Sequence, residues 1–193
     1  MINEYDFVTA AGNIAKHEAG HWLAAFKLGW NPRGIGLRVP SHAKDHNGYS
    51  ETSHRVDLSS IDDVRYYARG RVKILYSGVY AEHFDGKDFD NASIMRDLGR
   101  GGGAISDFWK AEEIYFFYYN CLDIKGTWEQ EFQPIICDVQ LMIEMHYDFI
   151  TSVAKYVMAR ANFVGQSIEI SSSDLIRIFK NSTIKLPDHD PLR

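Results

Sequence analysis

Cysteine is scarce in this chain of 193 residues: only Cys121 and Cys137 are present, and they form no C-x-x-C pair. Two distant cysteines cannot form a disulfide framework, a thiolate zinc site or a dithiol redox motif. Long apolar runs are missing as well, because the densest one, at 114–119, is far shorter than the roughly 20 residues that cross a bilayer. We therefore expect reduced thiols and no membrane-spanning segment.

Basic residues are not in excess, since 21 Lys and Arg stand against 26 Asp and Glu, which gives a formal net charge of −5. Nucleic-acid-binding proteins concentrate basic charge on one face, so we expect no nucleic-acid partner. The first residues, MINEYDF, lack the basic-then-apolar order of a secretory signal. These absences together predict a cytoplasmic protein.

Apolar residues make up 45% of the chain, which is enough for a core in one domain of this length. We expect a single domain over residues 1–185, followed by a frayed tail at 186–193. The apolar spacing predicts a mainly α fold, with a small β-sheet or hairpin beside the first helix. The expected helices span 9–28, 59–84, 104–121, 129–162 (broken at 146–148) and 171–180, and the expected strands span 34–39, 48–53 and 167–170.

Local signals define several of these boundaries. Gly29 is expected to end the first helix in the left-handed conformation. Pro134 is expected to limit where the fourth helix begins, because proline disrupts a helix interior. A turn is expected at 93–98, and Ser172 or Ser173 is expected to cap the last helix.

One pentapeptide, HEAGH at 17–21, lies inside the first expected helix. Residues four apart share one face of a helix, so the imidazoles of His17 and His21 can bind a single metal ion. Glu18 can then accept a proton from metal-bound water. Neutral imidazole suits zinc, so the pattern predicts a zinc hydrolase with Glu18 as general base; an accidental match of the spacing is the alternative. Gly20 costs about 1 kcal/mol relative to Ala inside a helix, which implies close approach of another backbone.

The third metal ligand is not part of this pentapeptide. The metzincin extension is absent, because Ala24 and Lys27 occupy the positions of its Gly and His. A glutamate soon after the motif is also unavailable, since none occurs between Glu18 and Glu51. The remaining candidates lie further along the chain: Glu82, His83, Asp107, His42, His46, His54 and His146.

Some of these residues have simpler explanations. Glu82 and His83 fit ordinary residues at a helix end, so Glu82→Ala is expected to leave zinc affinity nearly unchanged. His42, His46 and His54 fit a polar surface loop. The aromatic side chains that we expect in the core are Trp109 and those at 115–119.

Four segments resemble the peptidase domain of the FtsH family, the membrane-anchored AAA proteases. IAKHEAGHWLAA is similar to the zinc-binding helix of that family, and NGYSETS to a strand near its active site. RVKILYSGVYAEHFDG is similar to a helix ending in a GGRAAE-like stretch, with Gly78, Ala81 and Glu82 on matching positions. GGAISDFWKAEEI resembles the segment that carries the third zinc ligand. The likeness extends over 8–179, and from 136 onward it is one of pattern only.

The resemblance implies an FtsH-like zinc peptidase domain in which Asp107 completes the ligand set of His17 and His21. It also implies that a substrate strand lies against residues 48–53. Two departures concern the substrate cleft and the assembly: Ser77 replaces the first glycine of the family pair, and the glycines at 101–102 replace threonines. No G-x-x-x-x-G-K-[ST] phosphate loop occurs in the 193 residues, so we expect no AAA motor in this chain.

These observations predict a zinc-dependent endopeptidase that hydrolyses unfolded or exposed protein segments without ATP. Its expected cofactor is Zn²⁺, and its expected partner is a protein or peptide substrate. A separate AAA ATPase is a further candidate partner, and assembly into a homo-oligomer is compatible with the sequence. The alternative is a non-catalytic, peptidase-like binding or adaptor protein that acts with a separate AAA ATPase.

Overall fold

The computed structural model describes residues 6–42, 45–53 and 56–185. In this part of the chain the fold is mainly helical with a small three-stranded antiparallel sheet, which confirms the predicted fold class. The predicted tail at 186–193, the first five residues and the candidate ligand His54 lie outside the described residues.

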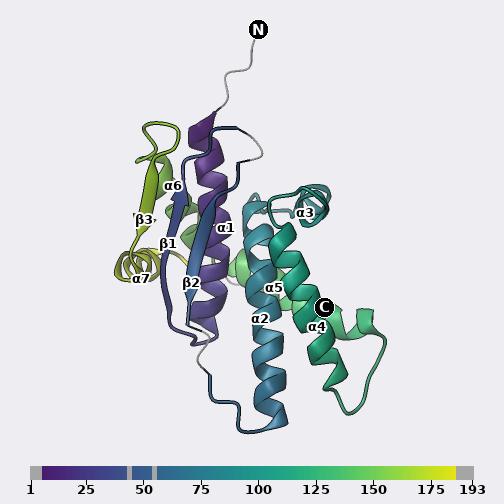
Figure 1. Cartoon of the computed structure of the whole chain (residues 1–193). Helices are drawn as coiled ribbons and strands as arrows, with labels where there is room; N and C mark the ends of the chain where they lie inside the picture. Colours follow the sequence, from purple (N-terminus) through teal and green to yellow (C-terminus); the bar gives the residue numbers. More distant parts are fainter. Residues whose placement is uncertain (1–5, 43–44, 54–55, 186–193) are drawn as a thin grey trace.

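Helix α1 (Phe7–Lys27) carries the HEAGH motif and runs through the middle of the molecule (Figure 1). The Asp6 carboxylate accepts hydrogen bonds from the backbone N–H groups of Val8 and Thr9, which have no partner within the helix. Gly29 follows the helix with a φ of +75°, as predicted. Other elements cover α1 on several sides, so almost every residue between 11 and 25 is buried.

The sheet packs against α1 and has the order β2-β1-β3. Its central strand, β1, is antiparallel to both neighbours, which confirms the predicted pair at 34–39 and 48–53. Trp22 of α1 holds the start of β1, because its indole N–H donates to the carbonyl of Arg33 at 2.9 Å. No described strand pairs with the outer side of β2, which is therefore an edge strand. The three strands are β1 (Pro32–Arg38), β2 (Gly48–Thr52) and β3 (Ser167–Ile170).

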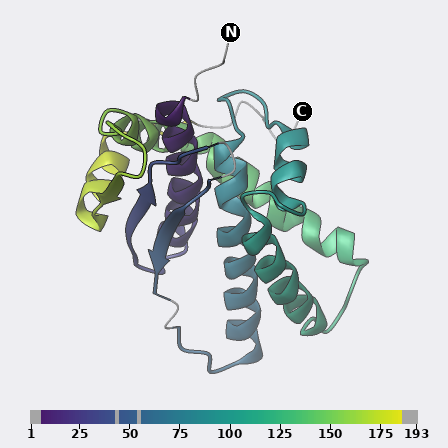
Figure 2. The ribbon, with the colours of Figure 1, turned by 45° about the horizontal axis from the view of Figure 1, so that its top comes forward.

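Helix α2 (Ile61–Glu82) lies beside α1, and helix α4 (Ile105–Asn120) packs along α2 (Figures 1 and 2). Ser60 and Asp63 form a capping box at the start of α2, which favours a helix beginning there. The helices α2 and α4 are antiparallel. Arg65, near the start of α2, donates to the carbonyl of Cys121, just after the end of α4, at 2.8 Å.

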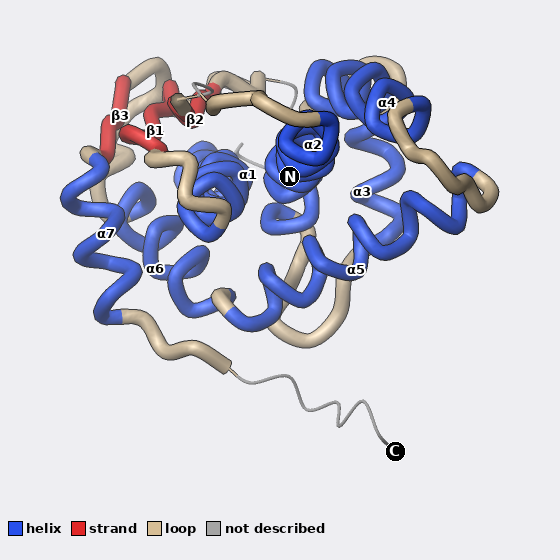
Figure 3. Tube along the Cα trace, turned by 90° about the horizontal axis from the view of Figure 1, so that it is seen from below, coloured by secondary structure: helices blue, strands red, loops and turns tan. Residues whose placement is uncertain are grey.

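The remaining large helices form a layer on the face of α1 and α2 opposite the sheet and α4 (Figure 3). The predicted break at 146–148 is confirmed, because His146 separates two of these helices. The cap of the last helix is Ser171, not Ser172 or Ser173 as predicted. The helices of this layer are α5 (Trp128–Met145), α6 (Tyr147–Met158) and α7 (Ser172–Asn181).

Two boundary predictions are wrong. The expected turn at 93–98 is part of a helix, α3 (Asn91–Leu98), whose first turn is capped by the Asp90 carboxylate. Pro134 does not limit the start of α5 but lies inside it, since the helix begins at Trp128. Because Pro134 is exposed, the carbonyl that loses its N–H partner can bond to water instead.

The aromatic run on α4 is only partly in the core, contrary to prediction. Tyr115 and Tyr118 are buried, but Trp109, Phe116 and Phe117 are 62%, 42% and 54% exposed. The reason is that α4 packs through one face, mainly against α2, so that only side chains three or four positions apart are covered.

Gly20 is required by the contact between α1 and α2. A Cβ on Gly20 would lie 2.2 Å from the carbonyl oxygen of Ser77 and 2.7 Å from the Cβ of Ala81. The close approach that the sequence predicts is therefore made by α2. We expect Gly20→Ala to lower the free energy of unfolding by about 1–3 kcal/mol, although alanine is the better helix former.

Urea denaturation followed by circular dichroism measures this change. Gly29→Ala is a poor control because of its positive φ, whereas Ser152→Ala changes a partly buried position on α6 without meeting a backbone. A Gly20→Ala variant as stable as the parent would contradict this account of the α1–α2 contact.

Candidate metal centre

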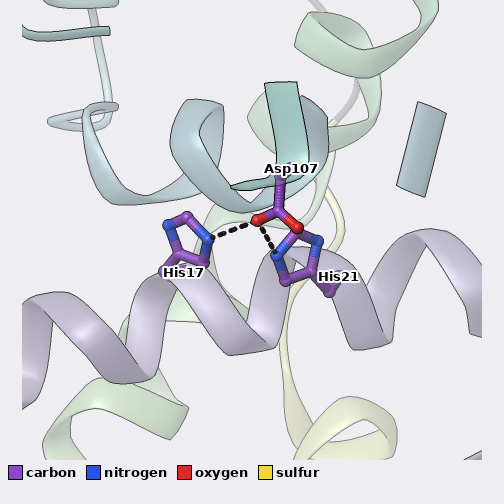
Figure 4. Close-up of side chains that lie close together, drawn as sticks. All are labelled: His17, His21 and Asp107. Atoms are coloured by element: carbon purple, nitrogen blue, oxygen red, sulfur yellow. Dashed lines mark hydrogen bonds and ion pairs between the residues drawn. The ribbon is translucent and has the colours of Figure 1, made fainter. Parts of the chain in front are cut away.

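The two histidines of the HEAGH motif project from one face of α1, and Asp107 in the first turn of α4 points between them (Figure 4). The Nε2 atoms of His17 and His21 lie 3.4 and 3.2 Å from the same Asp107 oxygen, Oδ2. Asp107 follows His17 by 90 positions, so only the packing of α4 on α2 brings it there. The structure thus brings together the three residues that motif and resemblance propose as ligands.

The Nδ1 atoms of His17 and His21 make hydrogen bonds that orient the two imidazole rings. His17 Nδ1 donates to Glu82 Oε2 at 3.0 Å, and His21 Nδ1 donates to the carbonyl of Ile74 at 2.7 Å. A carboxylate and a carbonyl can only accept, so the proton is placed on Nδ1 of each ring. In the neutral form of each ring, Nε2 then has the lone pair that can bind a metal ion, which is the usual arrangement of histidine ligands.

The donor atoms fit a zinc ion. Bond lengths of 2.0–2.2 Å and tetrahedral angles place two donors of one zinc about 3.4 Å apart, close to the separations of Asp107 Oδ2 from the two Nε2 atoms. Space is kept beside these atoms by Gly78 of α2. A Cβ there would lie 2.5 Å from His21 Nε2 and 2.6 Å from His17 Nε2.

The carboxylates around His17 favour positive charge at this point. Burial opposes a charged imidazole, but the hydrogen bonds with Asp107 and Glu82 outweigh it and raise the pKa of His17 to about 10. Burial also opposes ionisation of Asp107, yet His17 and His21 hold the pKa of its carboxyl group well below the usual range. A proton on His17 offsets part of the negative charge of these carboxylates, and a metal cation in its place would do the same.

Glu18 lies next to the proposed ligands and is 4% exposed. Burial raises the pKa of its carboxyl group, and the imidazoles of His21 and His17 offset this only in part. A carboxylate with a raised pKa is a stronger base than one in water. A Cβ on Gly48 would lie 2.5 Å from Glu18 Oε1, so β2 begins directly against this carboxylate.

The sequence suggests that His46 belongs to a polar surface loop. Instead, its ring packs edge-on against that of His17, with ring centroids 4.8 Å apart. Its Nε2 atom is buried and has no hydrogen-bond partner among the described residues. Burial lowers the pKa of His46, so that the ring favours its neutral form. No spacing in the sequence links His46 to the motif.

None of the other described candidate ligands belongs to the donor group of His17, His21 and Asp107, but His46 could hold a metal ion together with His17 and Glu18, and Glu82 and His83 could do so with Asp97. His83 contacts Asp97 Oδ2 at 2.7 Å, which connects the end of α2 to α3. His146 is buried between α5 and α6, with its ring 5.2 Å from that of Phe179. His42 is exposed.

An open cleft of about 280 Å³ runs beside the donor atoms. Its walls come from α1, α2, α4 and β2, so it lies between the edge strand and α4. Besides the proposed ligands and Glu18, the residues that line it include His46, Gly48, Tyr49, Ser50, Thr52, Arg71 and Lys110.

Glu82 is more than an ordinary residue at a helix end, which corrects the expectation from sequence. It is the last residue of α2, and its carboxylate holds the ring of His17 in place. We expect Glu82→Ala to weaken zinc binding by roughly 10- to 100-fold, because a histidine ligand without its carboxylate partner is less basic and less well oriented. Competition with a chromophoric chelator measures the affinity.

Glu82→Gln should lose less affinity than Glu82→Ala, since the amide oxygen still accepts the Nδ1 proton but carries no charge. Glu113→Ala, at an exposed position on α4, is the matched control and should bind zinc like the parent. Equal zinc affinity of Glu82→Ala and the parent would restore the sequence-based expectation.

Comparisons with known protein families and with curated proteins find no match to this chain. No helix in the described part of the chain combines the length and apolar character needed to cross a membrane. The likeness to the FtsH peptidase domain therefore rests on the four segments quoted above.

Proposed function

We propose that this protein is a zinc-dependent endopeptidase acting on unfolded or exposed protein segments without ATP. The observation that carries the proposal is the convergence of two imidazoles and one carboxylate, with the buried Glu18 carboxylate beside them, on an open cleft. Structural zinc sites are closed by four protein ligands, whereas catalytic sites have three and keep one position open. A set of three donors facing a cleft supports the catalytic kind.

Each residue has a distinct role in this proposal. His17, His21 and Asp107 would hold the ion, which would supply a Lewis acid for the scissile carbonyl and lower the pKa of bound water to about 7. A carboxylate oxygen of Glu18 accepts the proton of the attacking water and later donates it to the leaving amine. Glu82 keeps the His17 ring oriented while the proton moves.

The substrate would bind as an added strand along β2. The outer edge of this strand has no partner among the described residues, and Gly48, Tyr49, Ser50 and Thr52 line the cleft. An extended peptide paired with such an edge gains main-chain hydrogen bonds irrespective of its sequence. The contact of Gly48 with Glu18 would bring the peptide backbone next to the proposed base.

Zinc content and chelator-sensitive cleavage together test the proposal. We expect one zinc per chain by elemental analysis, and cleavage of an unstructured protein such as denatured casein that stops with a chelator and returns with zinc. Affinity for zinc should fall steadily as the pH is lowered, because protons compete for the imidazole nitrogens and the raised pKa of His17 makes this competition felt already near neutral pH. Failure to bind zinc after its addition would overturn the proposal.

ATP dependence and the alternative function are tested in the same assay. Cleavage should not change with ATP, and a tightly folded substrate should remain intact because the chain contains no phosphate loop. A zinc-loaded protein that binds unfolded chains but hydrolyses none would favour the binding or adaptor role. Size measurements with candidate AAA ATPases then identify such an assembly.

A further inference from the structure

Two basic side chains line the metal cleft without an acidic partner. Among the described residues, neither Arg71 of α2 nor Lys110 of α4 forms an ion pair. The neighbouring arginines of α2 differ, since Arg65 pairs with Asp62 and Asp123, and Arg69 pairs with Asp138. Cationic charge is thus left available only on the cleft side of this helix.

The antiparallel packing of α2 and α4 places both cations on the same side of the metal centre. Arg71 precedes Gly78 by seven residues, which is about 10 Å along the axis of α2. Lys110 follows Asp107 by one helical turn, and α4 runs in the opposite direction. Both side chains therefore line the cleft on the same side of the donor atoms, Arg71 from α2 and Lys110 from α4.

Arg71 lies at a partly buried position in the cleft. Burial lowers the pKa of its guanidinium group, against the favourable influence of Tyr67 and of Asp107. A guanidinium group binds a carboxylate through two parallel hydrogen bonds, and such charge-assisted bonds are strong where water is partly excluded. Lys110, which is exposed, adds a second positive charge to the same cleft.

We infer that Arg71 and Lys110 form a subsite for a substrate carboxylate, so that this enzyme prefers peptides with an acidic group a few residues from the cleaved bond. The inference rests on the proposed peptidase function. The separation of Arg71 from Gly78 along α2, about 10 Å, supports the inference. An extended peptide advances about 3.3–3.6 Å per residue, so this separation corresponds to about three residues. The group is either an Asp or Glu side chain or the C-terminal carboxylate.

Matched peptides distinguish these two sources. A fluorogenic peptide of uncharged residues, blocked at both ends, receives glutamate in place of glutamine at one position at a time. A second set has a free or an amidated C-terminus at varied distance from the cleaved bond. We expect kcat/KM to be at least roughly 10-fold higher for the acidic member at one position or for one free terminus.

Variants connect this preference to the two cations. Arg71→Gln and Lys110→Gln should each reduce the acidic-over-neutral ratio, and Arg71→Glu should favour a lysine-containing peptide instead. Lys155→Gln removes the same charge from an exposed position on α6, outside the cleft, and should keep the ratio of the parent. Circular dichroism and melting curves check that each variant folds, and Lys110→Gln remains informative if Arg71→Gln does not.

Binding separates this inference from the peptidase proposal. The zinc-loaded Glu18→Gln protein is titrated with labelled acidic and neutral peptides, with and without Arg71→Gln. Cleavage by the parent with equal kcat/KM for all pairs overturns the carboxylate subsite and leaves the peptidase proposal standing. A carboxylate preference in binding that Arg71→Gln removes, without any cleavage by the parent, supports the subsite and overturns the peptidase. Equal binding of all peptides and no cleavage overturn both.

Discussion

Glu18→Gln is expected to retain zinc and to lose peptide hydrolysis by a factor of 10² to 10⁴ or more, since this is the contribution of general acid–base catalysis. The amide is close in shape to the carboxylate but cannot accept a proton. Glu18 is not one of the three proposed ligands, so the metal should remain. The measurements are zinc content and kcat for an unstructured protein substrate.

The stability of this variant provides a second readout. Burial raises the pKa of Glu18, which means that folding disfavours its charged form. A neutral amide avoids this cost, so the melting temperature of Glu18→Gln should equal or exceed that of the parent. Glu113→Gln, exposed on α4, is the matched control and should retain full activity. If Glu18→Gln cleaves as fast as the parent, Glu18 has another role and the peptidase proposal fails.

Asp107→Ala is expected to weaken zinc binding by roughly 10-fold or more and to abolish turnover. The change removes the carboxylate oxygen that lies near Nε2 of both His17 and His21, and two imidazoles fall short of the three protein ligands of catalytic zinc sites. Helix α4 should persist, because Asp107 is in its first turn and its buried residues, Ala111, Tyr115 and Tyr118, are unchanged. Chelator competition gives the affinity, and circular dichroism gives the helical content.

The comparison with Glu82 decides which carboxylate binds the metal. Glu82→Ala should reduce zinc affinity but leave measurable turnover at saturating zinc, whereas Asp107→Ala should have none. Asp88→Ala removes one negative charge at an exposed position outside the cleft and should match the parent in both measurements. If Asp107→Ala retains zinc and Glu82→Ala loses it, the proposed ligand set is wrong and the resemblance to the FtsH family has misled us.

Local features of the fold could be predicted because their causes are local. The positive φ of Gly29 and the break at His146 each depend on residues within one or two helical turns. Pro134 shows the limit of such rules. Its cost depends on whether the helix surface there faces water, which the sequence around it does not state.

The sequence by itself determined the pair of imidazoles and the adjacent carboxylate. His17 and His21 are four positions apart on α1, and this spacing places both on one face of the helix. Only the tertiary structure decided which groups from other helices contact these two imidazoles. Glu82 contacts His17 across 65 positions, the carbonyl of Ile74 contacts His21 across 53, and Asp107 arrives only because α4 packs on α2. Helical periodicity carries information over a few turns, whereas contacts between helices depend on how whole faces fit together, and no spacing rule encodes that fit.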